Sequence, residues 1–183
     1  IVDGHTAFTG GVNLADEYIN VKERFGHWKD SAILVQGEAA WSMTVMFLTM
    51  WGYIREVEED YDRLRPDGQP PEASLGKGYY VQPYADNPLD NEPVGETVYL
   101  NLVSKAKQYV YITTPYLIVS DSLNTALCSA AKAGVDVRII TPHIPDKKIV
   151  FELTRAHYEP LLEAGVRIFE YTPGFIHAKN FAV

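Results

Sequence analysis

The stretches Tyr109-Val-Tyr-Ile-Thr-Thr114 and Val135-Asp-Val-Arg-Ile-Ile-Thr141 decide the fold class of this sequence. Both are short and rich in β-branched and aromatic residues, a composition typical of strands. Residues 121–133, which lie between them, are predicted to form a helix, and Gly134 follows as a residue favoured just past a helix end. A strand, a helix and a second strand in this order predict a βαβ unit with a right-handed crossover and a parallel sheet.

The same alternation extends in both directions along the chain. The last helix is expected to have Asp146 as its N-cap, to break at Pro160 and to end at Gly165. Repeated βαβ units of this kind predict an α/β fold, with a largely parallel sheet that helices cover on both sides. The further strands are expected at residues 79–84 and 166–171, and the further helices at residues 95–108 and 146–164.

The first part of the chain is less regular. Strands are predicted within residues 1–9 and over residues 28–35. Residues 39–54 carry no charged side chain but are shorter than the ~20 apolar residues that span a bilayer. We therefore expect a buried core helix, with a membrane-surface helix as the second reading. The polar, Pro- and Gly-rich residues 60–78 are expected to form a linker or long loop.

Composition restricts the classes of partner. The 183 residues are 46% hydrophobic and 22% charged, which is typical of a soluble globular protein with a sizeable core. The net charge is −8 and no run of Lys or Arg occurs, so no nucleic-acid partner is expected. The single cysteine, Cys128, excludes an internal disulfide and a cysteine-based zinc site.

Two neighbouring strands are predicted to end alike, in Thr114-Pro115-Tyr116 and in Thr141-Pro142-His143. Ligands of parallel sheets bind at the carboxyl ends of the strands. Tyr116 and His143 could therefore line a pocket there. Both could equally be ordinary loop residues, and neither is assigned a catalytic role.

The last ten residues, 174–183, alternate apolar and polar side chains and are predicted to form one strand. Alternation places His177 and Lys179 on the same face of that strand. Lys supplies a compact positive charge and neutral His supplies a nucleophile or a proton carrier, which together suit a phosphate site. The alternative is an exposed edge strand that carries these two residues without a function.

A second polar motif lies near the start of the chain. Gly10 and Gly11 are adjacent, and Asn13 follows two residues later. Paired glycines allow the backbone to approach a ligand closely and allow amide groups to face an anion. A simple turn is the alternative, because Gly-Gly is a strong loop signal by itself.

These motifs carry a resemblance. His177-x-Lys179 is similar to the start of the H-x-K-x-x-x-x-D signature of the phospholipase D superfamily. Asp3, followed after six residues by Gly10-Gly11-x-Asn13, resembles the tail of the same signature, D-x-x-x-x-x-x-G-[GS]-x-N. The surrounding sequence is most similar to that of bacterial cardiolipin synthases. The matching segments are Ala7-Phe-Thr-Gly-Gly-Val-Asn-Leu-Ala-Asp-Glu-Tyr-Ile19, Tyr111-Ile-Thr-Thr-Pro-Tyr-Leu117, Val137-Arg-Ile-Ile-Thr-Pro142 and Gly174-Phe-Ile-His-Ala-Lys179.

The resemblance implies an architecture, a phospholipase D-like α/β/α sandwich with a mixed, largely parallel sheet. The superfamily carries its signature twice, once in each of two similar halves. Residues 1–59 would be the C-terminal part of the first half, residues 60–78 the linker or long loop, and residues 79–183 the second half, truncated inside its motif. The first His and Lys and the second Asp would then fall outside this sequence. We therefore expect an excised fragment that is inactive alone.

The resemblance also implies a mechanism for the parent enzyme. One histidine would attack phosphorus to form a phosphohistidine, and the other would transfer protons. His177 and Lys179 are the implied catalytic residues, and which histidine attacks stays open. Lysines and neutral donors would stabilise the phosphate oxygens, so no metal or other cofactor is implied. The residues implied to bind or orient the phosphate are Asp3, Gly10, Gly11, Asn13 and Asn180.

The implied reaction joins two phosphatidylglycerol molecules and yields cardiolipin and glycerol. A phospholipid would be the substrate, and the parent would sit at a bacterial cytoplasmic membrane through segments outside this sequence, whereas the fragment itself is expected to be soluble. Two alternatives remain. One is a phospholipase D-type hydrolase or nuclease of the same superfamily. The acidic net charge argues against the nuclease. The other is a non-catalytic binding module.

Overall fold

The computed structural model describes residues 1–58, 60–66, 80–87 and 90–183. By its internal contacts the chain forms two compact units, residues 1–9 with 33–95 and residues 10–32 with 96–183. The division differs from the sequence-based one, because residues 10–32 group with the C-terminal part of the chain. Each unit is described by itself.

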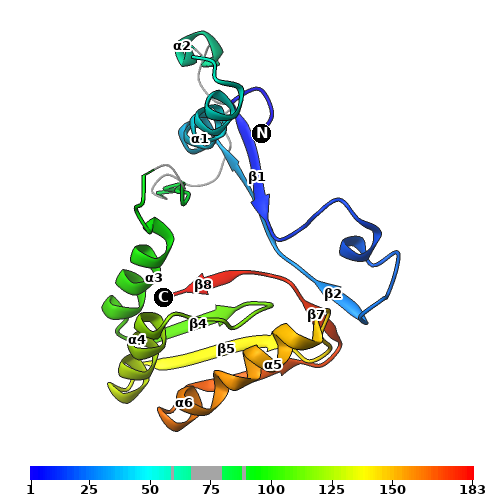
Figure 1. Cartoon of the computed structure of the whole chain (residues 1–183), viewed down its shortest axis with the longest axis vertical. Helices are drawn as coiled ribbons and strands as arrows, with labels where there is room; N and C mark the ends of the chain where they lie inside the picture. Colours follow the sequence, from blue (N-terminus) through cyan, green and yellow to red (C-terminus); the bar gives the residue numbers. More distant parts are fainter. Residues whose placement is uncertain (59, 67–79, 88–89) are drawn as a thin grey trace. The chain divides into compact units, whose positions relative to one another are not determined.

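The second unit is built on a four-stranded sheet with the order β6-β5-β4-β8 (Figure 1). β4 (Tyr109–Thr113) pairs in parallel with β5 (Asp136–Pro142), and β5 pairs in parallel with β6 (Arg167–Tyr171). β8 (Asn180–Ala182) runs antiparallel to β4. The predicted α/β class with a mixed, largely parallel sheet is confirmed.

Helices α3 (Val94–Lys105), α4 (Asp121–Lys132), α5 (Lys148–Ala156) and α6 (Tyr158–Glu163) alternate with these strands. Ser120 caps α4, since its hydroxyl accepts the N–H of Leu123 at 3.3 Å. The predicted helix 146–164 is in fact two helices that divide at His157, so the break expected at Pro160 was wrong. The expected N-cap was also wrong, because Lys147 occupies that position.

The core of this unit lies on one face of the four-stranded sheet. Val110 and Ile112 of β4 and Val137 and Ile139 of β5 are each at most 5% exposed, as the two-residue period of a strand predicts. They pack against Val103 of α3, Leu127 of α4 and Leu161 of α6, which belong to the same cluster. On the opposite face, four hydrophobic or aromatic side chains are at least 36% exposed. These are Tyr109, Tyr111, Ile140 and Phe169.

A two-stranded sheet completes the second unit. β2 (His27–Lys29) runs parallel to β7 (Gly174–Ile176), with Trp28 opposite Phe175. The predicted strand 28–35 is therefore divided, because its second part forms β3 (Ala32–Gln36), which pairs with β1 (Thr6–Gly10) in a different sheet. A short 3₁₀ helix, η1 (Asp16–Ile19), lies between β1 and β2 in the sequence.

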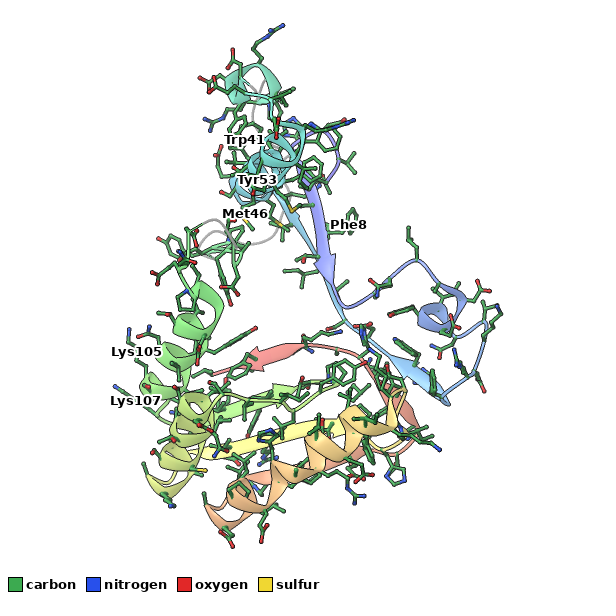
Figure 2. All side chains as sticks on the ribbon, in the orientation of Figure 1. Phe8, Trp41, Met46, Tyr53, Lys105 and Lys107 are labelled. Carbon is green, nitrogen blue, oxygen red and sulfur yellow. The ribbon has the colours of Figure 1, made fainter. Side chains whose placement is uncertain are left out.

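The first unit contains α1 (Glu38–Arg55) and the short α2 (Tyr61–Leu64), which Asp60 caps. Figure 2 shows Trp41, Met46 and Tyr53 along α1. The prediction that α1 is a buried core helix was wrong for much of its surface. Ala40 and Leu48 are buried, but three side chains expected in the core are 39–55% exposed, namely Phe47, Met50 and Trp51. Within this unit a two-stranded sheet has too little area to cover an 18-residue helix on all sides.

Two further expectations concern the same unit. Residues 80–84 do not belong to a strand, so the strand predicted at 79–84 was wrong for the residues that the structure describes, and Tyr79 lies outside them. Most of the predicted linker, residues 67–78, also lies outside the described residues. No helix in the described part of the chain combines the length and hydropathy needed to cross a bilayer.

Candidate active site

His177 lies where the chain passes from one sheet to another. β7 ends at Ile176 and β8 begins at Asn180, so the single strand predicted over residues 174–183 was wrong at residues 177–179. The N–H of His177 still donates to the carbonyl of Lys29 at 2.7 Å, which fixes the backbone at this point. The break results from a change of partner, because β7 pairs with β2 whereas β8 pairs with β4.

A buried carboxylate holds the imidazole of His177. Asp30 Oδ2 lies 2.9 Å from His177 Nδ1, and the two side chains are 3% and 13% exposed. A carboxylate only accepts at neutral pH, so Nδ1 carries the proton and Nε2 carries the lone pair. Asp30 is itself fixed, since its Oδ1 accepts the N–H of Ser31 at 2.8 Å. This arrangement selects the tautomer in which Nε2 can act as a nucleophile or a base.

Lys179 lies against the same imidazole. Its Nζ is 2.8 Å from Nε2 and 2.9 Å from Nδ1, and it donates to the carbonyl oxygen of His177 at 2.7 Å. Because the ammonium is almost equidistant from both ring nitrogens, it sits off the axis of the Nε2 lone pair. Burial lowers the pKa of Lys179 below the usual lysine value, and the charge of Asp30 opposes that shift. The structure thus brings the two motif side chains together, although no continuous strand connects them.

Three aromatic rings surround the imidazole. Tyr18 meets it edge-on with ring centroids 5.3 Å apart, Trp28 lies at 5.3 Å and Phe175 at 6.0 Å. Trp28 and Phe175 are 8% and 1% exposed. The rings restrict the orientation of His177 and exclude water from much of its surface, so charge interactions at the ring are stronger than they would be in bulk water.

The paired glycines are required by close packing. A Cβ on Gly11 would overlap the carboxylate of Asp30, and a Cβ on Gly10 would lie 2.5 Å from the Cα of Ala32. The N–H of Gly11 donates to the carbonyl of Ser31 at 3.0 Å. In the structure this amide therefore bonds to the backbone, and the visible function of Gly11 is to leave room for Asp30.

The other predicted site residues divide between the two units. Asn13 donates to the hydroxyl of Tyr18 at 2.8 Å, which connects it through one ring to His177. Asn180 accepts the hydroxyl of Ser31 at 3.0 Å. Asp3 belongs to the first unit, where it is exposed in a turn with a φ of 50°.

Sequence reasoning missed Asp30 and Tyr18. A carboxylate directly after the strand motif His27-Trp-Lys29 was the available signal for Asp30, but nothing local reveals that its partner lies 147 residues further along the chain. Tyr18 occurs in a segment without regular periodicity, so its contact with His177 is likewise a tertiary feature. Neither could be assigned to the site without the fold.

Tyr116 and His143 both follow the carboxyl ends of strands, as predicted. The hydroxyl of Tyr116 donates to Asp146 Oδ2 at 2.6 Å. His143 is exposed, and its Nδ1 lies 2.8 Å from Glu170 Oε2. In the described part of the chain, no group of three or more His, Cys, Asp or Glu side chains is arranged to hold a metal ion.

Comparisons with known proteins agree with the resemblance in the sequence. A family model described as "Cardiolipin synthase, PLD-like domain" matches residues 99–183. A cardiolipin synthase of Geobacillus kaustophilus is 37% identical over 184 residues, covering 100% of this chain and 36% of its own length. Cardiolipin synthase 2 of Bacillus anthracis is 37% identical over 98% of this chain and 34% of its own length. An uncharacterized protein of Streptococcus mutans is 50% identical over 99% of this chain and 38% of its own length.

A solved structure supports the fold. The crystal structure of a phosphatidylserine synthase from Haemophilus influenzae matches 98% of this chain and 50% of its own chain, with a TM-score of 0.55 and 15% identity. The chain spans little more than a third of the length of the curated relatives it matches, since the shares are 34–38%.

Proposed function

We propose that this chain belongs to the cardiolipin synthase-like branch of the phospholipase D superfamily, and that the protein containing it transfers a phosphatidyl group from one phosphatidylglycerol to another. The products are cardiolipin and glycerol. The observation that carries the proposal is the contact of the His177 imidazole with both the buried Asp30 carboxylate and the Lys179 ammonium. The cardiolipin synthases that align along the whole chain support the choice of lipid.

The proposed chemistry runs through Nε2 of His177 and an imidazole from the other signature of the superfamily. One imidazole attacks phosphorus, so a P–N bond forms and the P–O bond to glycerol breaks. The other imidazole gives its proton to the departing glycerol oxygen and later takes the proton of the incoming hydroxyl. Both roles use a lone pair or proton on Nε2, and in both the Asp30 carboxylate stabilises the cationic ring that forms.

Lys179 and the donors near it would stabilise the transferred group. The ammonium supplies a compact positive charge within reach of the non-reacting phosphate oxygens, and Asn13 supplies a neutral donor. We propose that Asn180, Gly10 and Gly11 act by shaping this region, since they pack around Ser31 and Asp30. For Asp3 we propose an orienting role on the basis of the sequence motif alone.

The organisation of the protein is proposed on the same basis. Residues 79–183 would form most of the second phospholipase D-like half, residues 1–59 the C-terminal part of the first, and residues 60–78 the connection. Because the substrate is a membrane lipid, the protein would work at a bacterial cytoplasmic membrane.

The test is the product spectrum of the full-length protein on phosphatidylglycerol vesicles, read by mass spectrometry. We expect cardiolipin and glycerol in equal amounts, and no turnover by residues 1–183 alone, because the chemistry needs imidazoles from both signatures. If phosphatidic acid formed without cardiolipin, the protein would be a hydrolase and the proposal would be wrong. If the protein bound lipid but formed no product, it would be a binding module instead of an enzyme.

A further inference from the structure

A second polar cluster lies at the carboxyl ends of β4 and β5, next to the His177 site but separate from it. Tyr116 follows β4, and Asp146 and Lys147 follow β5. The hydroxyl of Tyr116 donates to Asp146 Oδ2 at 2.6 Å, and Lys147 Nζ lies 5.3 Å from the centroid of the Tyr116 ring. Tyr116, Asp146 and Lys147 are called the strand-end cluster below.

The strand-end cluster is close to the imidazole. The ring of Tyr116 lies 6.4 Å from that of Phe175, which in turn lies 6.0 Å from His177. Phe175, which is 1% exposed, therefore contacts both the Tyr116 ring and the His177 ring. In Figure 1 the carboxyl ends of β4 and β5 point toward β7, the strand that leads into His177. Phe175 is thus packed against both the strand-end cluster and the imidazole.

The cluster is not explained by the stability of α5. Asp146 precedes this helix but is not its N-cap, and α5 has no side-chain cap hydrogen bond. Lys147 and Lys148 stand at the N-terminus instead, with no acidic residue in the first turn. Cations at this end oppose the helix dipole and cost stability. A bound anion would remove that cost.

The groups present match a phosphorylated polyol. Burial and the Asp146 carboxylate raise the pKa of Tyr116, so its phenol stays protonated and donates to Asp146. The phenol oxygen can still accept, and Asp146 Oδ1 accepts from none of the described residues. Both oxygens can therefore accept hydrogen bonds from the hydroxyls of an alcohol. The ammonium of Lys147 is exposed and suits a phosphate.

We propose that the strand-end cluster binds the headgroup of the acceptor lipid, a glycerol carrying a phosphodiester, with Lys147 on the phosphate and with Asp146 and Tyr116 on the hydroxyls. The inference rests on the proposed function and adds the acceptor subsite to it. In the second step, the acceptor hydroxyl oxygen forms a P–O bond as the P–N bond to histidine breaks. The hydroxyl proton goes to the other imidazole. The cluster orients the acceptor and thereby favours an alcohol over water as the second nucleophile.

The test uses the full-length protein on phosphatidylglycerol vesicles and measures the ratio of cardiolipin to phosphatidic acid, together with the phosphatidylglycerol content that gives half-maximal transfer. Asp146→Asn and Tyr116→Phe are expected to lower the ratio roughly ten- to a hundredfold, as the loss of a hydrogen bond to a charged group does. They should also raise the half-maximal phosphatidylglycerol content.

Tyr111→Phe is the matched control. The hydroxyl of Tyr111 also donates to a carboxylate, Asp136 Oδ2 at 2.9 Å, but this pair lies at the start of β5 instead of its end. Removal of that hydroxyl should leave the ratio at the wild-type value. A fall in Tyr111→Phe equal to that in Tyr116→Phe would overturn the proposal.

Lys147→Gln provides a second test that does not depend on a buried group, since Lys147 is exposed. It should weaken transfer to phosphatidylglycerol and leave transfer to an added short alcohol without phosphate unchanged. Equal weakening for both acceptors would contradict the subsite. Unchanged product ratios in Asp146→Asn and Tyr116→Phe, with transfer intact, would overturn the subsite alone. A wild-type protein without any phosphatidyl product would overturn the proposed function as well.

Discussion

Substitution of Asp30 by Asn tests whether the buried carboxylate prepares His177 for chemistry. Asp30 is 3% exposed at its side chain and 2.9 Å from Nδ1 of an imidazole that is itself 13% exposed. Asn keeps the size of the side chain and can still accept the N–H of Ser31, so the fold should survive. What it removes is the negative charge that stabilises a cationic imidazole.

The expected loss of reaction rate lies between two limits. A hydrogen bond to a charged group is worth about 1.5–3 kcal/mol, and each 1.36 kcal/mol is tenfold in rate, so the charge alone accounts for roughly 10- to 150-fold. An Asn that turns its amide toward Nδ1 would donate instead and place the proton on Nε2. In Ser-His-Asp triads, that change of tautomer costs roughly 10⁴-fold. We therefore expect the rate of the full-length Asp30→Asn protein to lie between these two limits.

The assay is the initial rate of cardiolipin formation, with a thermal melt on the same sample to show that the protein is folded. Gly11→Ala gives an independent route to the same effect, because its Cβ would displace the Asp30 carboxylate without touching its charge. Asp136→Asn is the control, since Asp136 pairs with Arg138 and Arg167 outside the site. A folded Asp30→Asn protein with a rate within threefold of the wild type would refute the reasoning.

Two further predictions follow from the described contacts. Burial lowers the pKa of Lys179, so the ammonium loses its charge at a lower pH than an ordinary lysine does. Activity that needs this charge should therefore decline at that lower pH in a pH–rate profile. Lys179→Arg should move the decline to higher pH. The hydroxyl of Thr154, which is 1% exposed, accepts the N–H of Leu117 at 3.1 Å. Thr154→Val leaves that donor unpaired and should lower the free energy of unfolding by about 1–3 kcal/mol in denaturant titration, whereas Thr154→Ser should cost less.

The α/β alternation of the second unit could be predicted because its signals are local. Strands rich in β-branched residues and the glycines after α4 and α6 identify the βαβ units without any tertiary information. Gly134 and Gly165 indeed adopt positive φ values of 92° and 96°, as helix-ending residues do. The proximity of His177 and Lys179 was also local, since it depends on a spacing of two residues.

Features that depend on distant partners could not be predicted. The break after Ile176 arises because the neighbouring strand changes from β2 to β4. The alternation of apolar and polar residues does not reveal this change, because it would be the same beside either strand. Burial of α1 was overestimated because composition shows that a helix is apolar but not how much surface covers it. Asp146 matched an N-cap pattern, yet its carboxylate accepts the hydroxyl of Tyr116, 30 residues earlier in the chain.

The measurement that tests the central claim most directly is the rate of cardiolipin formation by the full-length protein with the single substitution His177→Ala. The proposed chemistry predicts a loss of several orders of magnitude, because Nε2 of His177 either attacks phosphorus or carries the proton. The melting temperature should stay close to that of the wild type, since His177 lies between two strands at a backbone position fixed by its N–H bond to Lys29. A folded His177→Ala protein that forms cardiolipin at a near-normal rate would contradict the assignment of this site.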